Sequence, residues 1–133
     1  MVSENSQDDT VLKHLHAIGV ELIVEWDALA FLYRHSASLG TAAQIAWFIG
    51  YDETKTVAAL HRLEALGLIQ RSRASQGIRM YQFSAPVEPG RYSCLLELMS
   101  LAQHRTGRLL LRRHLRRPSP EPRRRRDGGL RLA

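Results

Sequence analysis

Apolar residues recur with helical spacing in the first third of the chain. Within residues 9–18 they stand three or four positions apart behind a polar cap, which predicts a helix that ends near Gly19. A second helix is predicted over residues 25–35, where the apolar side chains form one stripe, and residues 36–40 interrupt it. Residues 20–24 form an apolar linker whose local structure the pattern leaves open.

The next two helices are bounded by residues that favour helix ends. Thr41 and Gln44 match a capping box, in which the threonine hydroxyl accepts the N–H of the glutamine and the glutamine side chain accepts the N–H of the threonine. This helix is expected to end at Gly50, because glycine adopts the left-handed conformation at little cost. Asp52 can cap a following helix that ends before Gly67.

The short helix after Thr41 has one inner face. Ile45 and Phe48 share that face and are expected to be buried. Trp47 lies on the other side, where we expect it to pack against a neighbouring helix, with a ligand contact as the alternative.

After Gly67 the apolar period changes from helical to alternating. Residues 68–73 and 78–83 alternate broadly enough for two strands, and Gly77 in the connection can supply the positive φ that a hairpin needs. The pattern therefore predicts one small β-hairpin.

A long amphipathic helix is predicted over residues 90–117, with Gly107 as a weak point inside it. Its apolar side chains form one broad stripe that includes Tyr92, Leu95, Leu96, Met99, Leu109 and Leu110. A domain of this size has no obvious surface that could bury this stripe. We therefore expect the stripe to form the interface of a twofold dimer, with residues 9–24 as a second candidate segment of that interface. The alternative is a helix that folds back on its own core.

Together these elements predict a mostly α fold with one small hairpin, in the α+β class. The polar ends of the chain contain too few apolar residues to order themselves. The expected organisation is a disordered lead, an N-terminal helix with its linker, a central domain, a C-terminal helix and a disordered arginine-rich tail, at residues 1–8, 9–24, 25–86, 90–117 and 118–133.

Length and composition indicate a single cytoplasmic domain. The 133 residues suit one core with tails, and they lack the roughly 18 to 20 consecutive apolar residues of a membrane span. The acidic N-terminus is unlike a secretory signal. Cys94 is the only cysteine, so an internal disulfide is excluded and a zinc site lacks ligands. We expect no cofactor and no membrane partner.

The net charge of +6 is unevenly distributed. Residues 1–70 carry four basic against nine acidic residues, whereas residues 71–133 carry fifteen arginines against four acidic residues. The basic half favours a polyanionic partner. Genomic base composition can account for part of the arginine content. The tail is therefore open to two interpretations, a nonspecific DNA clamp or a solvated extension.

The central segment contains the most specific motif. Its parts are Thr41-Ala-Ala-Gln-Ile-Ala46, then Thr56-Val57, then Leu60-His-Arg-Leu-Glu-Ala-Leu-Gly-Leu-Ile-Gln-Arg71. This run resembles the recognition helix and first wing strand of MarR-type winged helix-turn-helix repressors, over less than half of the chain. It does not distinguish the MarR branch from the PadR and ArsR branches. The resemblance implies a winged helix-turn-helix with flanking helices, in a homodimeric transcription regulator that binds double-stranded DNA.

The helix after Asp52 has an outer arc suited to DNA. On a helical wheel Val57, Leu60 and Leu63 lie inside, and the arc opposite them is small at Ala58. A helix that enters the ~12 Å major groove needs such a narrow polar face. The candidate contacts are Thr54, Lys55, His61 and Arg62, with Thr56 nearer the inner edge and with Thr41 and Gln44 at the start of the preceding helix. An ordinary solvated helix face has similar residues.

The hairpin has positive charge that this helix lacks. Asp52 and Glu53 stand at the helix start, where a phosphate favours an uncompensated dipole, so affinity is expected to come from the hairpin. The candidates are Arg71, Arg73, Ser75, Gln76 and Arg79, which resemble wing residues that enter an adjacent minor groove. The other interpretation is that these arginines only make the hairpin soluble.

Other chemistries find little support in the sequence. His14 and His16 point to different faces of a helix and the remaining histidines are scattered, so no metal site is expected. Cys94 resembles a buried structural cysteine more than a redox sensor. No phosphate loop, catalytic triad or catalytic carboxylate pair is recognisable, and we expect no enzyme activity. The rival interpretation is a winged-helix module that binds proteins, which the acidic reading helix suits.

Overall fold

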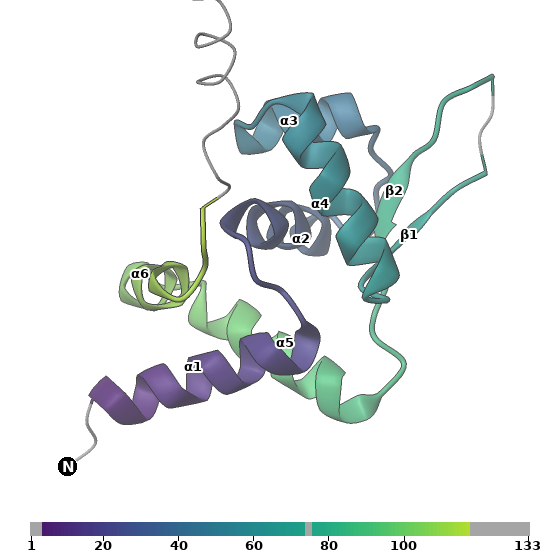
Figure 1. Cartoon of the computed structure of the whole chain (residues 1–133). Helices are drawn as coiled ribbons and strands as arrows, with labels where there is room; N and C mark the ends of the chain where they lie inside the picture. Colours follow the sequence, from purple (N-terminus) through teal and green to yellow (C-terminus); the bar gives the residue numbers. More distant parts are fainter. Residues whose placement is uncertain (1–3, 74–75, 118–133) are drawn as a thin grey trace, which may run out of the picture.

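The computed structural model describes residues 4–73 and 76–117 of the chain, and Figure 1 shows its elements. Six helices and one two-stranded antiparallel sheet occur in these residues. In chain order they are α1 (Glu4–Ile18), α2 (Ile23–Arg34), α3 (Ala42–Ile49), α4 (Glu53–Ala65), β1 (Ile69–Arg71), β2 (Tyr81–Phe83), α5 (Pro89–Leu101) and α6 (Arg105–Arg113). The predicted α+β mixture of helices with one small hairpin is confirmed.

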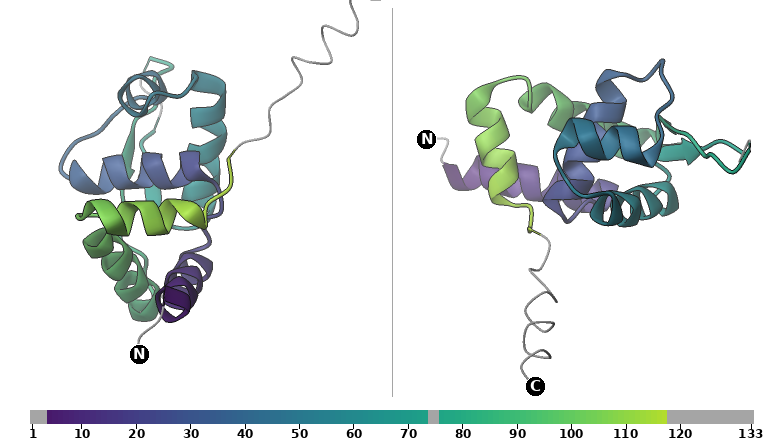
Figure 2. Two further views of the ribbon diagram at one scale, coloured as in Figure 1. Left: turned by 90° about the vertical axis from the view of Figure 1, so that its left-hand side faces the viewer. Right: turned by 90° about the horizontal axis from the view of Figure 1, so that it is seen from above.

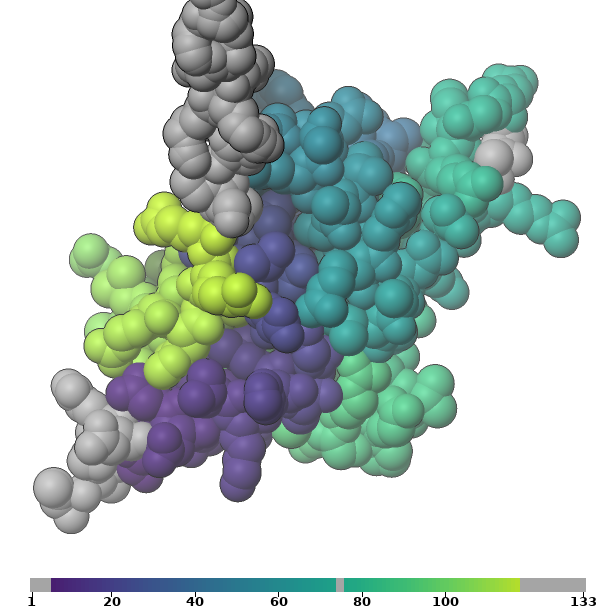
Figure 3. All heavy atoms as spheres, viewed as in Figure 1, coloured from purple at the N-terminus to yellow at the C-terminus, as the bar shows by residue number. Residues whose placement is uncertain are grey.

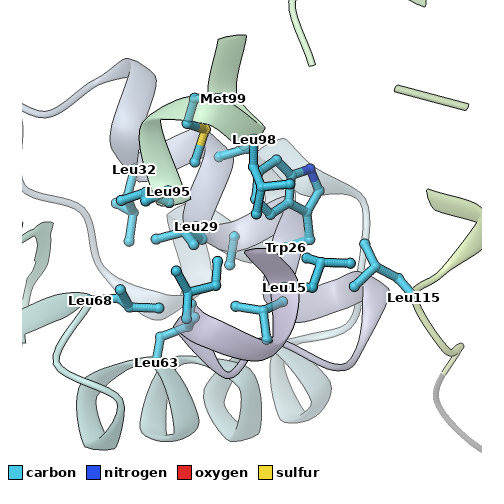
Figure 4. Close-up of a cluster of buried hydrophobic side chains, with 14 of the residues drawn as sticks. Leu15, Trp26, Leu29, Leu32, Leu63, Leu68, Leu95, Leu98, Met99 and Leu115 are labelled. Atoms are coloured by element: carbon cyan, nitrogen blue, oxygen red, sulfur yellow. The ribbon is translucent and has the colours of Figure 1, made fainter. Parts of the chain in front are cut away.

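The elements form two groups that share one core. Helices α2, α3 and α4 lie together with the hairpin, while α1 lies along α5 and α6 lies beside α2 (Figure 1, Figure 2). Buried side chains of both groups meet between them, among them Leu15, Trp26, Leu29, Leu63 and Leu98 (Figure 4). Because interiors of this kind are close-packed, the position of α4 is fixed by the flanking helices as well as by its own neighbours.

The sequence signals at both ends of α3 and at the start of α4 are confirmed. Thr41 Oγ1 accepts the N–H of Gln44 at 3.1 Å, and Gln44 Oε1 accepts the N–H of Thr41 at 3.0 Å. Gly50 ends α3 with a φ of 81°. Asp52 Oδ1 accepts the N–H of Lys55 at 2.8 Å. Caps of this kind contribute about 1 kcal/mol each, and here they set where α3 and α4 begin.

The hairpin is shorter than the alternating pattern predicts. β1 and β2 pair over three residues each, and the last pair joins Arg71 to Tyr81. Beyond it, Ser72 donates its N–H to the Met80 carbonyl at 2.8 Å and its hydroxyl accepts the Met80 N–H at 3.0 Å, which ends the ladder. Tyr81 also exchanges backbone hydrogen bonds with Gly40. The segment before α3 therefore supports the base of the hairpin.

Helix α1 begins at Glu4, which contradicts the expected disordered lead over residues 1–8; the first three residues lie outside the described part. Asp8 explains part of the difference, because its Oδ1 lies 2.8 Å from His114 Nε2 and 3.2 Å from Arg113 Nη2. The hydrogen bond with His114 is the largest influence on the pKa of Asp8, which lies below its usual value. A local pattern cannot reveal partners so distant in sequence.

The C-terminal segment forms two helices, not the single helix predicted over residues 90–117. α5 ends at Leu101 and α6 starts at Arg105. Gly107 permits this arrangement, because a Cβ at that position would collide with the Leu101 carbonyl. The apolar stripe is therefore divided, and α5 folds back on the core of its own chain. The arginine-rich tail lies outside the described residues.

Candidate nucleic-acid interface

A stripe of exposed side chains runs along α4 on the side away from the core. Thr54, Ala58 and His61 are exposed and follow one another at helical spacing, and we call these three residues the reading stripe. The buried side chains on the opposite side of the helix are Thr56, Ala59, Leu60 and Leu63. α4 therefore offers solvent a narrow surface of small and hydrogen-bonding groups, with Thr54 and His61 where the sequence prediction needs them.

Two predicted DNA contacts on α4, Thr56 and Arg62, form hydrogen bonds within the fold. Thr56 is 0% exposed, and its hydroxyl donates to the Asp52 carbonyl at 2.9 Å. The guanidinium of Arg62 donates to Glu25 Oε2 at 3.1 Å and to the Gly19 carbonyl at 2.7 Å. Arg62 thus ties α4 to the connection between α1 and α2. The prediction of DNA contact is corrected for Thr56, which is enclosed, whereas for Arg62, whose side chain is 44% exposed, it stays a prediction.

Glu25 is the buried carboxylate with which Arg62 forms this ion pair. Its side chain is 2% exposed, and its Oε1 also accepts the N–H groups of Glu21 at 3.0 Å and Leu22 at 3.1 Å. A buried charge without a partner is strongly destabilising, so the pair with Arg62 holds α4 against α2. Sequence reasoning missed Glu25 because its cationic partner lies in another helix, 37 positions away.

Three other predicted contacts lie outside the reading stripe. Lys55 is partly exposed, with its Nζ 3.6 Å from Asp52 Oδ2. Thr41 and Gln44 stand at the start of α3, where their side chains are engaged in the capping box. Contact of these three with DNA stays a prediction.

Exposed arginines follow α4 on the hairpin. Arg73 and Arg79 are exposed, whereas Arg71 Nε lies 3.4 Å from Glu64 Oε2 of α4. The hairpin extends past α4 on the side of the molecule remote from α1 (Figure 1, Figure 2). The Arg71 to Glu64 pair therefore joins the base of the hairpin to one flank of α4 and leaves the two outer arginines open to solvent.

The turn of the hairpin contains the expected glycine. Gln76 and Gly77 have φ values of 57° and 79°, so both stand in the left-handed region. Gly77 adopts this conformation at little cost, while at Gln76 it costs on the order of 1 kcal/mol. Both residues are exposed, and Ser75, the remaining predicted contact of the hairpin, lies outside the described residues.

Two aromatic side chains of α3 are exposed, contrary to the prediction for both. Trp47 is 78% exposed and Phe48 is 63% exposed. Phe48 stacks on Phe31 of α2 with ring centroids 5.2 Å apart, and Trp47 meets Phe48 edge-on at 5.2 Å. α3 is short and buries only Ile45 and Ala46, so the apolar pattern overstates how much of it reaches the core.

A polar network joins the turn before α4 to the C-terminal helix. Tyr51 donates its hydroxyl to Asp27 Oδ2 at 2.8 Å, and Arg112 Nη1 of α6 donates to Asp27 Oδ1 at 2.8 Å. Burial, followed by the hydrogen bond to Asp27, raises the pKa of Tyr51 to about 12. The network links the start of the reading helix to the flanking helices through side chains that the sequence pattern did not single out.

The predicted dimer residues divide into two groups. Leu95 and Met99 are 0% and 7% exposed and belong to the core of the chain, so the prediction of dimer contact is wrong for these two. Leu96 and Leu109 are exposed, whereas Tyr92 and Leu110 are partly buried against the core, and dimer contact of these four stays a prediction. Among them, Leu109 is 57% exposed.

Neither a metal centre nor a membrane span is found in the described part of the chain. No three side chains of the His, Cys, Asp and Glu types come together there in a way that could hold a metal ion. None of the helices in residues 4–73 and 76–117 combines the length and apolar content needed to cross a bilayer.

Comparison with solved structures decides the fold. A crystal structure of a MarR-family transcriptional regulator from Silicibacter pomeroyi matches with a TM-score of 0.53 and 17% sequence identity, over 98% of this chain and 88% of that one. The chain has a MarR-type winged helix-turn-helix fold. No protein-family model matches the sequence, and no curated protein matches it. The winged helix-turn-helix comprises α2, α3, α4 and the hairpin, and α1, α5 and α6 are its flanking helices.

Proposed function

We propose that the chain is a transcription regulator of MarR type that binds double-stranded DNA sequence-specifically. α4 enters the major groove, and the hairpin lies on the adjacent minor groove or backbone. The observation that carries the proposal is the reading stripe, which points away from the core on the helix next to a hairpin with exposed Arg73 and Arg79. The likeness in fold to a MarR-family regulator supports it. Such a protein acts in the cytoplasm and needs no catalytic group.

The reading stripe has the chemistry that base reading requires. Ala58 keeps the centre narrow, so the helix backbone can approach the base edges. Thr54 and His61 offer hydrogen-bonding groups about one turn away on each side. The buried side and the tie through Arg62 hold the helix in one position, which a sequence-reading element needs.

The hairpin supplies the attraction for phosphates that α4 lacks. Asp52 and Glu53 at the start of α4 are exposed and repel a phosphate. Arg73 and Arg79 are exposed on the hairpin, and each phosphate contact steepens the salt dependence of binding by about 0.9 unit. The acidic start of α4 is therefore compatible with DNA binding when the hairpin binds the same duplex.

We further propose a homodimer that joins two copies through the flanking helices. Leu109 borders a hollow of about 300 Å³ on the α6 side, whose other apolar walls are Leu101 and Leu110. A second copy covers these side chains and places two reading helices about 34 Å apart, one turn of duplex DNA. The variant L109E is expected to be monomeric by light scattering. V87E, which alters a 91% exposed apolar residue outside α6, is expected to stay dimeric.

Selection of duplexes from a random pool tests the proposed function. The full chain is expected to enrich one sequence family and to bind it saturably. His61→Ala should weaken that binding by about tenfold and relax the preference at one base position, since one good base contact discriminates by about 1–3 kcal/mol. His16→Ala, at an exposed position of α1, is the matched control and should change neither.

Binding to proteins is the rival function, and the exposed Trp47 and Phe48 favour it. The same selection separates the two. A folded protein that binds no duplex below roughly 100 μM, the weak end of ordinary nonspecific binding, supports the rival.

A further inference from the structure

After α6 the chain passes alongside the start of α2. Arg116 donates its backbone N–H to the Glu21 carbonyl at 3.0 Å, and its carbonyl accepts the N–H of Ile23 at 2.8 Å, in a parallel bridge with Leu22. These two backbone hydrogen bonds fix the path of the chain whatever side chain stands at position 116. The described part of the chain therefore ends, at Arg117, in a defined place on the winged helix-turn-helix.

That place is beside α4. Arg116 and Arg117 line a groove of about 510 Å³, and Lys55, Ala58 and Arg62 of α4 line it as well. In Figure 3 the yellow end of the described chain and the teal surface of α4 lie on the same face of the molecule, with the blue start of α2 between them. Arg116 and Arg117 thus border the helix proposed to read DNA.

The groove lies on one flank of the reading stripe and the hairpin lies on the other. At about 100° per residue, Lys55 and Arg62 stand to one side of the stripe and Glu64 stands to the opposite side. Glu64 is the residue that holds Arg71 of the hairpin. A duplex laid along the reading stripe therefore meets the hairpin on one side and Arg116 and Arg117 on the other.

The charges of Arg116 and Arg117 are available to a polyanion. Arg117 is exposed and has no ion-pair partner among residues 4–73 and 76–117. Arg116 pairs with Glu21 at 3.0 Å, but the two side chains are 69% and 58% exposed, and such surface pairs are weak enough for a phosphate to replace the carboxylate.

We propose that Arg116 and Arg117, at the end of the described chain, form a third DNA-contacting element, which binds backbone phosphates on the flank of α4 opposite the hairpin. This inference rests on the proposed function and adds a partner surface to it. Contacts to phosphates carry no sequence information, so these two arginines raise the affinity for all duplexes by the same factor and leave the base preference to the reading stripe.

The test uses the full chain with Arg116→Gln and Arg117→Gln together. Affinities for the selected duplex and for a scrambled duplex are measured over a range of salt concentrations. Loss of two phosphate contacts predicts a fall of about tenfold near physiological salt for both duplexes, and a salt slope smaller by roughly two units. The control variant, Lys13→Gln with Arg105→Gln, removes the same charge from exposed positions of α1 and α6 and should keep the wild-type slope.

The single variant Arg117→Gln separates an effect on DNA binding from an effect on folding, because it leaves the pair between Arg116 and Glu21 in place. It should lower the slope by roughly one unit at an unchanged free energy of unfolding. An unchanged slope in the double variant, or an equal change in the control, overturns the inference. If the wild type binds duplexes and only His61→Ala weakens that binding, this inference fails alone; if the wild type binds no duplex, the proposed function fails with it.

Discussion

Helix α4 and the hairpin differ in how firmly the protein holds them. α4 is buried along one side, with Thr56 fully enclosed, and Arg62 ties it to Glu25 in another helix. The hairpin pairs over three residues per strand and carries Arg73 and Arg79 in solvent. The helix that places hydrogen-bonding groups is rigid and poor in free positive charge, while the element with the charge has few constraints.

The physical demands on the two elements explain this difference. A hydrogen bond to a base edge needs atoms placed within about half an ångström, which only a packed support provides. Attraction to a phosphate acts over about 10 Å at moderate salt and tolerates a flexible support. Base selection and overall affinity can therefore be assigned to different elements, so they should respond separately to mutation.

Ala58→Glu should have the largest effect, because it places a carboxylate at the centre of the reading stripe. The like charge of the DNA makes this unfavourable by about 3 kcal/mol, or roughly a hundredfold in affinity, measured by titration of a labelled duplex. The free energy of unfolding should not change, since the side chain is exposed. Ala17→Glu at an exposed position of α1 should keep its affinity, and an equal loss there would remove the stripe from the interface.

Arg62→Ala should lower the free energy of unfolding in urea by about 2 kcal/mol, because Glu25 loses its cationic partner. This figure is below that of a fully buried pair, since the Arg62 side chain is 44% exposed. The neighbouring variant His61→Ala should change stability by less than about 0.5 kcal/mol, as for most exposed positions. If Arg62→Ala kept full stability and lost affinity for DNA, Arg62 would be a reading residue after all.

The sequence could predict those features of the site that depend on residues close together in the chain. Caps such as Thr41 and Asp52 are local, so their hydrogen bonds and the turn they frame followed from the order of residues alone. The roles of Arg62 and Thr56 depend on Glu25 and on the depth at which α4 packs, and neither is visible within one helix. The helical wheel of α4 identified its exposed face correctly, but it did not show which residues at the border of that face are buried or paired.

In the flanking helices, too, the features that the sequence did not predict depend on contacts between different parts of the folded chain. The break between α5 and α6 depends on the close approach of residue 107 to the Leu101 carbonyl, which only the folded chain reveals. The early start of α1 is explained in part by Asp8, whose carboxylate contacts His114, 106 positions away in sequence. The exposed Trp47 was missed because helical spacing alone does not tell how much of a short helix has a neighbour to pack on.

Arg73→Ala and Arg79→Ala should each weaken duplex binding by about five- to tenfold. Each change should also flatten the salt dependence by roughly one unit, with the base preference and the stability unchanged. Arg105→Ala removes the same charge from the start of α6 and should leave binding as it is. A shift in base preference with either hairpin variant would contradict the division between reading and attraction.

Tyr51→Phe should have the smallest effect, below about 1 kcal/mol in unfolding, because one partly exposed hydrogen bond is lost. In the wild type, the pKa of Tyr51 lies near 12, above the ordinary 10.0. A raised pKa means that this contribution is complete below pH 10 and is lost as the pH rises through about 12. In an absorbance titration of the tyrosine phenolates, the step near pH 12 should therefore be absent from the variant.

The position of the duplex on the protein tests the central claim most directly. Amide resonances of the full chain can be followed while the selected duplex is added. We expect Thr54, Ala58 and His61 to shift together with Arg73 and Arg79, at one common duplex concentration, while α1 and α5 stay unchanged. Shifts confined to the exposed aromatic residues of α3, or hairpin shifts without any on α4, would contradict the account.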